Sequence, residues 1–187
     1  GLLGVVADIV KVDKEYEIAV ETALGGSIQN IVTDNEETAK RMIQFLKKNK
    51  FGRATFLPLT SMHGGNGIRN EEALREPGVI GLANTLVHVE KKYQVLADQL
   101  LGKTVVVDHI DHGIAIAKKY RQSLRLVTLE GDLINPGGSM TGGAFKNSSN
   151  LLSRRREIEE FEKHVVVIKD KIQEIEESLA GIKQKRG

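Results

Sequence analysis

The sequence predicts an α+β fold with two subdomains related by a pseudo-twofold axis, carrying mixed β-sheets and short helices, followed by a coiled-coil helix. Three observations lead to this prediction. A pattern of sixteen residues occurs twice, strand-like and helix-like segments alternate after each copy, and an apolar heptad seam runs to the end of the chain. The boundaries follow from these patterns: a first subdomain with a connecting loop at 1–77, a second subdomain at 78–147, and a helical arm at 148–187.

The repeat is the strongest evidence for two related subdomains. Residues 10–25 align without gaps on residues 87–102, and six of the sixteen positions are identical. A Gly-Val-hydrophobic opening precedes each copy, at Gly4 and at Gly78, and a β-rich run ends in Asp34 or Asp108. Repeated units of this size usually pack about a pseudo-twofold axis and bury a shared face.

Helices and strands follow in the same order in both copies. The first copy predicts a helix from Asp13 or Lys14 to Leu24, and another over 35–49 that Asn35 caps. The matching helices of the second copy are predicted at 90–101 and 111–120, the latter capped by Asp111. A short strand then follows each pair, at 54–57 and 126–129, and residues 61–77 form the connecting loop.

The final segment carries the spacing of a coiled coil. Its seam consists of Leu151, Arg154, Ile158, Phe161, Val165, Ile168, Ile172, Ile175, Leu179 and Ile182. The intervals alternate between three and four residues, which is the a/d pattern. A lone helix of this kind leaves its apolar stripe in water. We therefore expect an antiparallel partner helix in a longer protein of which this chain is a part.

Composition narrows the class of protein. The 187 residues are 40% hydrophobic, so the chain can build a core. Cysteine is absent, which excludes disulfides and thiolate zinc sites. No apolar run has membrane-spanning length, so we expect no membrane partner and a cytoplasmic location. The formal net charge of +2 does not by itself indicate nucleic-acid binding.

Three apparent catalytic signatures fail on inspection. Gly102-Lys103-Thr104 resembles the end of a phosphate-binding loop, but it runs from helix to strand and lacks the earlier glycine. Ser139 lies among glycines without the spacing of a nucleophile elbow. The histidines of the segment 108–112 could supply metal ligands, but a solvated turn before a helix is the favoured interpretation. We predict no catalytic, cofactor-binding or metal-binding residue in this chain.

Basic residues gather in two stretches without acidic residues between them. The first contains Lys40, Arg41, Lys47, Lys48, Lys50 and Arg53, and the second contains Lys146, Arg154, Arg155 and Arg156. Either stretch could neutralise phosphates without reading bases. A solvated helix face is the alternative for the first. For the second, three arginines that open a helix oppose the helix dipole, which favours another use.

A run dense in glycine, residues 135–143, closes the second subdomain. Gly137, Gly138, Gly142 and Gly143 remove side chains where another backbone must approach closely. A flexible linker is the alternative. Because Leu133 and Ile134 lead in as a short strand, an edge strand that pairs with another chain is favoured.

Several motifs together resemble one family. Asn135-Pro-Gly-Gly-Ser-Met-Thr-Gly-Gly143, preceded by Leu126-Val-Thr-Leu-Glu-Gly-Asp-Leu-Ile134 and followed by Leu151-Leu-Ser-Arg-Arg-Arg-Glu157, is similar to the hinge of structural maintenance of chromosomes (SMC) proteins of bacterial and archaeal type. Ala23-Leu-Gly-Gly26 and Gly52-Arg-Ala-Thr-Phe-Leu-Pro58 also fit the pattern. The resemblance covers nearly the whole chain.

The resemblance implies a dimerisation hinge between two coiled-coil arms of a nucleoid-associated ATPase of chromosome condensation and segregation, whose ATPase heads lie elsewhere. Two hinges form a ring-shaped homodimer, in which the glycine segment of one chain meets the first half of the other. The implied dimer residues are Gly137, Gly138, Ser139, Met140, Thr141, Gly142 and Gly143. The implied contacts for sequence-independent DNA binding are Lys146, Arg154, Arg155 and Arg156. The basic clustering adds Lys47 and Lys48 of the first stretch to the predicted DNA contacts.

Two rival functions compete with this interpretation. A small nucleotide-using enzyme is the first, suggested by the segment around Lys103, and nucleotide binding would discriminate it. A zinc-hook DNA-repair ATPase is the second, and the absence of cysteine removes its metal ligands.

Overall fold

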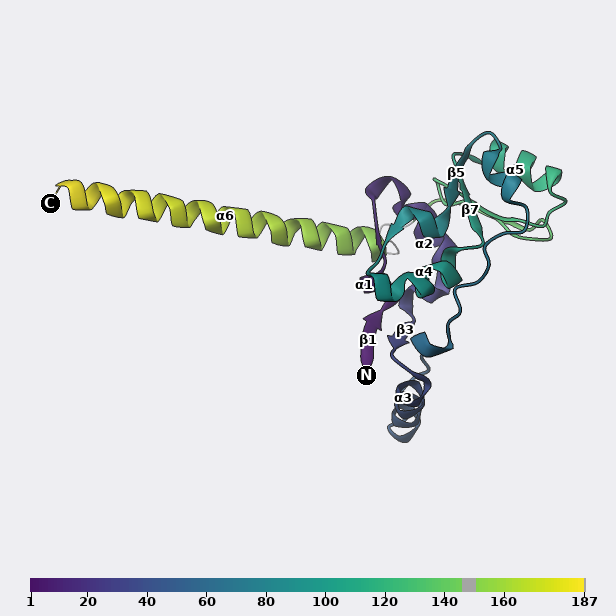
Figure 1. Cartoon of the computed structure of the whole chain (residues 1–187), viewed down its shortest axis with the longest axis horizontal. Helices are drawn as coiled ribbons and strands as arrows, with labels where there is room; N and C mark the ends of the chain where they lie inside the picture. The colour runs from purple at the N-terminus through teal and green to yellow at the C-terminus, as the bar shows by residue number, and fades with distance from the viewer. Residues whose placement is uncertain (146–150, 187) are drawn as a thin grey trace. The chain divides into compact units, whose positions relative to one another are not determined.

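The computed structural model describes residues 1–145 and 151–186 (Figure 1). The chain separates into two compact units, which we call the body (Gly1–Leu152) and the tail (Ser153–Gly187). The body combines mixed β-sheets with short helices, and the tail continues one long helix, α6 (Leu151–Arg186). The predicted fold class is therefore confirmed, while the predicted boundary between the two subdomains stays a prediction.

Each copy of the repeat contributes one mixed sheet. The first sheet has the order β1-β3-β4, formed by β1 (Leu2–Val5), β3 (Ile31–Thr33) and β4 (Phe56–Pro58). The second has the order β10-β9-β8-β7-β5, formed by β5 (Val79–Leu82), β7 (Thr104–Val107), β8 (Arg125–Thr128), β9 (Leu133–Ile134) and β10 (Met140–Thr141). Each sheet contains one parallel pair, β3 with β4 or β7 with β8. The other strands pair antiparallel, β1 with β3 in the first sheet and β5 with β7 and β8 with β9 in the second.

The repeat seen in the sequence is a repeat in space. Helix α2 (Glu17–Leu24) and helix α4 (Gln94–Leu101) begin and end at matching positions, a constant separation of 77 residues. Strand β2 (Lys11–Val12) pairs antiparallel with β6 (Val87–His88), and Lys11 faces His88, its own counterpart in the repeat. Two equivalent residues that face each other lie on a local twofold axis, as the predicted pseudo-twofold relation requires.

One part of the predicted alignment is wrong. The Gly-Val-hydrophobic openings at Gly4 and Gly78 are not equivalent, because the strand registers shift between Leu2 and Gly4 in one sheet and between Val79 and Gly81 in the other. Gly4 therefore matches Gly81, which extends the separation of 77 residues to the start of the chain. The valines after Gly4 belong partly to α1 (Val6–Ile9) and only look like those after Gly78.

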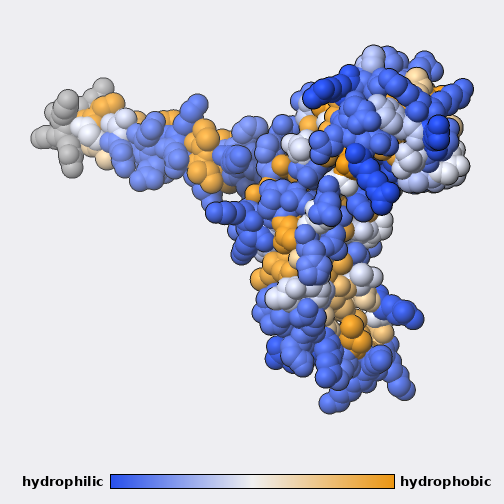
Figure 2. All heavy atoms as spheres, turned by 45° about the vertical axis from the view of Figure 1, so that its right-hand side comes forward, coloured by the Kyte–Doolittle hydropathy of each residue, from blue (hydrophilic) through white to orange (hydrophobic). Residues whose placement is uncertain are grey.

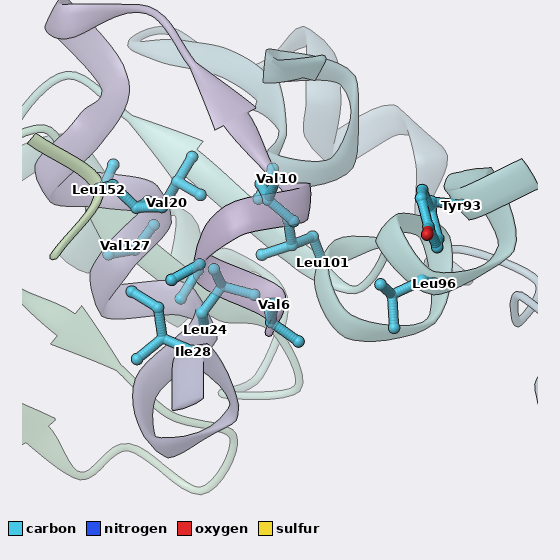
Figure 3. Close-up of a cluster of buried hydrophobic side chains, with 14 of the residues drawn as sticks. Val6, Val10, Val20, Leu24, Ile28, Tyr93, Leu96, Leu101, Val127 and Leu152 are labelled. Carbon is cyan, nitrogen blue, oxygen red and sulfur yellow. The ribbon is translucent and has the colours of Figure 1, made fainter. Parts of the chain in front are cut away.

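A shared core joins the two copies. Helices α2 and α4 lie in contact, and the side chains drawn in Figure 3 come from both. The labelled members are Val6, Val10, Val20, Leu24, Ile28, Tyr93, Leu96, Leu101, Val127 and Leu152, all at most 6% exposed. Tyr93, at 6% exposed, is thus a core residue. Burying these side chains contributes most of the stabilisation of the body, at about 1.5–3 kcal/mol for each large aliphatic group.

A second core belongs to the second copy alone. Helix α5 (Ile110–Lys119) packs on β7, β8 and β9. The residues buried there are Ala73, Val105, Val107, Ile116, Ala117, Leu124, Leu126 and Ile134. Among the described residues, no such core lies under the matching helix of the first copy, α3 (Glu36–Lys48), which buries only Thr38 and Ala39.

The two helix starts differ from each other. The Asn35 side chain accepts a hydrogen bond from the Thr38 N–H at 3.0 Å, so the predicted cap of α3 is confirmed. The predicted cap of α5 by Asp111 is wrong, because α5 begins one residue earlier and Asp111 lies inside its first turn. Asp108, at the end of β7, instead accepts from the His109 N–H at 2.7 Å.

Helix α6 starts inside the body. Leu152 is 3% exposed in the shared core, and the buried carboxylate of Glu21 accepts a hydrogen bond from the Leu151 N–H at 2.9 Å. Along the tail, the predicted seam residues from Ile158 to Ile182 are mostly about half exposed, and Figure 2 shows hydrophobic atoms along the helix. None of the described helices combines the length and the apolar character needed to cross a membrane.

Candidate functional site

The glycine run forms a tight hairpin. The Gly138 N–H donates to the Asn135 carbonyl at 2.9 Å, and the turn between them holds Pro136 and Gly137. Proline at the second position and a φ of 92° at Gly137 define a type II turn, which needs glycine at its third position. The Gly137 N–H also donates to the Gln122 carbonyl at 2.8 Å, which joins this turn to the turn that follows α5.

Strand β10 leaves this turn as the outermost strand of the five-stranded sheet. Met140 faces Ile134 of β9, and Met140 is 53% exposed. The Asn135 N–H donates to the Ser139 carbonyl at 2.9 Å, so the next pair outward, Ile134 with Met140, is the non-hydrogen-bonded kind. The backbone N–H and C=O of Met140 consequently point away from β9, toward the open edge.

The predicted dimer residues lie together on this hairpin, and all but Gly138, which is partly covered, are exposed. These residues differ in whether a substitution would disturb the fold of the hairpin itself. A Cβ at Gly142 would lie 2.7 Å from the Asp132 carboxylate, and Gly143 has a φ of 137°. Both glycines are therefore constrained within their own chain, so a substitution there would not test an interface alone. Met140 carries no such constraint.

Phe145 follows the hairpin and packs against the body. A Cβ on Gly131 would lie 2.1 Å from the Phe145 ring and 2.9 Å from Ile18, so both side chains lie directly over this glycine. Gly131 has a φ of 90°, which also favours glycine. The ring is 40% exposed, and one of its sides is occupied by the chain itself.

The first copy carries an uncovered apolar surface that the sequence analysis missed. Ile43 is 41% exposed, Phe45 50% and Phe51 59%, and the two phenylalanine rings lie 5.9 Å apart. In Figure 2, hydrophobic atoms reach the surface in the lower part of the body, where Figure 1 places β1, β3 and α3. Because β4 is an edge strand, this surface continues to an open sheet edge.

The comparison of the copies explains the exposure of Ile43. In the second copy, Ile134 of β9 lies beside β8 and joins the core under α5, and a Cβ on Gly113 would lie 3.2 Å from Ile134. In the first copy, no described strand takes the equivalent place beside β4. The cap at Asn35 predicted that this segment is a helix, but a cap carries no information on whether an apolar face of the helix is covered.

The predicted DNA contacts lie in both units. Lys47 and Lys48 are exposed in the last turn of α3, in the body. Arg154 is exposed in the tail, whereas Arg156 is partly covered and donates to Glu160 one turn later at 2.9 Å. Arg155 is exposed and also has an interaction within the chain. Lys146 lies outside the described residues.

The described residues contain one cluster with metal-ligand chemistry. The ligand atoms of Asp108, His109 and His112 lie within 4.8 Å of one another at the start of α5. His112 Nδ1 lies 2.7 Å from Asp108 Oδ1, and this hydrogen bond holds the pKa of Asp108 below its ordinary value. The first copy has the same device without histidine, since Asp34 accepts from Thr38 Oγ1 at 2.6 Å. The cluster therefore occupies the same place at the helix start as the Asp34–Thr38 pair of the first copy.

Comparison with known proteins shows the family. A sequence profile described as SMC proteins Flexible Hinge Domain matches residues 1–117. This chain belongs to the SMC hinge family. The chromosome partition protein Smc of Desulfitobacterium hafniense is 45% identical over 160 residues, which cover 85% of this chain and 13% of that protein. The Smc protein of Bacillus subtilis is 39% identical over 186 residues, covering 98% of this chain and 16% of the relative. This hinge thus spans a small part of the relatives it matches.

Solved hinge structures share the fold. An asymmetric dimer of the Geobacillus stearothermophilus SMC hinge domain matches with a TM-score of 0.83 at 38% identity, covering 97% of this chain and 74% of that one. The Pyrococcus furiosus SMC hinge domain matches with a TM-score of 0.64 at 32% identity, covering 77% of this chain and 73% of that one. The predicted resemblance to this family is confirmed.

Proposed function

We propose that this SMC hinge is the dimerisation module of a chromosome partition protein. The observation that carries the proposal is the pair of unlike edges in one chain: an exposed glycine hairpin that ends in β10, and an uncovered apolar face beside β4. The dimer in which the Geobacillus stearothermophilus hinge crystallised is consistent with this proposal. Catalysis is not part of it, because the ATPase of the whole protein is proposed to lie in other domains.

The proposed contact is strand addition. Strand β10 of one protomer pairs with β4 of its partner, and the outward N–H and C=O of Met140 supply hydrogen bonds to that edge. A strand in this place would cover Met42 and Ile43 of α3, as Ile134 covers their counterparts Ile116 and Ala117 in α5. A twofold axis would repeat the contact, so two chains would close into a ring.

The test compares two substitutions at one position. Met140→Pro removes the outward N–H and leaves the bonds of β10 to β9 in place, because proline is tolerated where an edge strand faces outward. Met140→Ala keeps that N–H and serves as the matched control. By light scattering at micromolar concentration, the wild type and Met140→Ala should have twice the 20.6 kDa mass of one chain, and Met140→Pro should be a folded monomer. A monomeric wild type, or a dimeric Met140→Pro, contradicts the proposal.

We propose sequence-independent DNA binding as a second role. The supporting observation is the end of α3, where Lys47, Lys48, Lys50 and Arg53 are exposed and form no ion pair among the described residues. Cations without intramolecular partners can neutralise phosphates at little cost. Arg154 is exposed in the tail and is a weaker candidate because it also occupies the seam.

A salt titration tests this role. Each lost phosphate contact should reduce the slope of log affinity against log salt by about 0.9 on duplex DNA. Lys47→Gln with Lys48→Gln should lower both the affinity and the slope, while Lys14→Gln with Lys91→Gln, at exposed matching positions of the repeat, should leave both unchanged. An equal effect of both pairs would mean that only net charge matters. An unchanged slope in the first pair would remove these lysines from the DNA surface.

We also propose, from membership of the SMC hinge family, which helix pairs with α6 and where the whole protein acts. The half-exposed seam of α6 would pair with an antiparallel arm helix of the same full-length chain, since a stripe of this spacing packs into a second helix. The relatives are named chromosome partition protein Smc, and we propose that the whole protein acts in chromosome partition, at the nucleoid in the cytoplasm.

A further inference from the structure

A cavity in the second copy has an unusual lining. It has a volume of about 360 Å³ and is lined by Gly67, Ile68, Arg69, Asn70, Lys103, Ser123, Leu124, Arg125 and Pro136. Three of these nine residues are basic and none is acidic. Ile68, Leu124 and Pro136 supply apolar surface to the same cavity. This volume lies within the range of small-ligand pockets.

Of the three basic residues that line the cavity, Arg125 is partly buried and the other two are exposed. Arg125 Nη1 donates to the Ala23 carbonyl at 3.0 Å and to Thr104 Oγ1 at 2.7 Å. A guanidinium has five N–H donors, so those on Nε and Nη2 are left without an acceptor among the described residues. Desolvation by burial lowers the pKa of Arg125, and no described carboxylate compensates for it. A cation in this condition is stabilised by any anion that enters the cavity.

Arg69 and Lys103 provide the other two charges. Both side chains are exposed, and neither has an ion pair among the described residues. Lys103 is the lysine of the segment that resembles a phosphate-binding loop. Lys103 lies between α4 and β7, so no helix begins there to bind a phosphate with its N-terminal N–H groups. The guanidinium groups of Arg69 and Arg125 line the same cavity and can bind the phosphate instead.

Backbone strain lies next to the cavity. Arg121 and Gln122 both have a φ of 58°, in the left-handed region that disfavours side chains. Arg121 occupies the usual glycine position after a helix, as Lys50 does after α3, but Gln122 has no counterpart of this kind. The turn presents Ser123 and Arg125 to the cavity. Strained residues of this kind gather at binding sites.

We propose that this cavity binds a small polyphosphate anion, such as pyrophosphate or the phosphate tail of a nucleotide, between Arg69, Lys103 and Arg125. Guanidinium groups match phosphate oxygens in pairs, and a lysine adds a point charge. The hydroxyl of Ser123 already donates to the Tyr120 carbonyl at 2.6 Å, so the two guanidinium groups and the lysine supply the donors of the site. More than one phosphate is favoured, because three cations without carboxylates exceed the charge of one phosphate group.

Titration calorimetry with inorganic pyrophosphate tests the proposal on the 187-residue chain. The wild type should bind one pyrophosphate per chain, and Lys103→Gln or Arg69→Gln should each weaken binding roughly ten-fold, the loss of one charge-assisted contact. Lys118→Gln, which removes an exposed charge outside the cavity, should leave the affinity unchanged. The amide resonances of Gly67 and Ser123 should shift during the same titration.

Three outcomes overturn the proposal. Absence of binding at millimolar pyrophosphate, or equal weakening by Lys118→Gln, would mean that the cavity is not a site. In a competition arm, a DNA duplex is added to the pyrophosphate complex. If DNA displaces pyrophosphate and Lys103→Gln weakens DNA binding by the same factor, the cavity belongs to the DNA surface and not to a small anion.

Discussion

At the scale of single residues, Glu21 joins the start of α6 to the body. Its side chain is buried among the helices of the shared core, and its carboxylate accepts from the Leu151 N–H. Burial raises the pKa of Glu21, the Leu151 hydrogen bond opposes that rise, and Glu17 adds to it. The net direction is upward, so the native state holds this proton more tightly than the unfolded chain does.

The sign of the pH dependence follows. Because the native pKa lies above the unfolded value, the contribution of Glu21 to the free energy of unfolding falls as pH rises from about 4.5. Glu21→Gln keeps an acceptor for Leu151 and removes the titration. Urea unfolding at pH 5 and pH 7 should show a smaller loss of stability in this variant than in the wild type. Glu15→Gln, at an exposed position, should behave as the wild type, and equal pH dependence in all three would refute the assignment.

Alanine substitutions at Asn35 and Asp111, which lie at equivalent helix starts, should lower the free energy of unfolding by different amounts. Asn35→Ala removes the hydrogen bond to the Thr38 N–H and should lower the free energy of unfolding by about 1 kcal/mol. Asp111→Ala should cost less than half of that, because Asp111 makes no capping bond. Thermal or urea unfolding of both variants checks the difference. A larger loss in Asp111→Ala would restore the cap that the sequence predicted.

At the scale of elements, the sequence predicted those helices and strands that nearby residues alone determine. The amphipathic helices and Asn35 before α3 required no knowledge of their neighbours. The misplaced match of Gly4 arose because strand register is set by pairing across the sheet. The false cap at Asp111 arose because α5 begins one residue earlier than predicted. The uncovered face of α3 could not be predicted, since exposure depends on β9 being present in one sheet and absent from the other.

Helix α6 gives an element-scale prediction. Its seam is exposed, and a Cβ on Gly181 would meet nothing within 4 Å, so Gly181 has no packing role in the isolated chain. Gly181→Ala should favour the helical state there by about 1 kcal/mol. Amide exchange should slow around residue 181 in this variant, whereas Ala180→Gly should have the opposite effect. Uniform strong protection along the wild-type tail would indicate that two tails pair in solution.

At the scale of the whole molecule, the two proposed functions are linked by geometry. A dimer presents each basic surface twice, so a second contact forms at a high effective concentration. Met140→Pro should therefore weaken binding to long duplex DNA more than ten-fold but leave binding to a duplex too short for two contacts nearly unchanged. Fluorescence anisotropy with both lengths measures this. Equal effects on both lengths would mean that Met140 acts locally, and no effect on either would separate DNA binding from dimerisation.

The pairing of Lys11 with His88 has a consequence for ancestry. Segments that meet their own counterparts across a local axis are what two copies of one short ancestral chain would form, and a tandem duplication would then have fused that pair into one gene. The two halves now differ: one carries β9 and β10 beyond β8, whereas no described strand lies beyond β4 in the other. Because the halves differ, each chain has one free strand, β10, and one open sheet edge at β4. In the proposed dimer, the β10 strand of each chain pairs with the β4 edge of the other. The loss of symmetry inside the chain is thus what makes the proposed symmetry between chains possible.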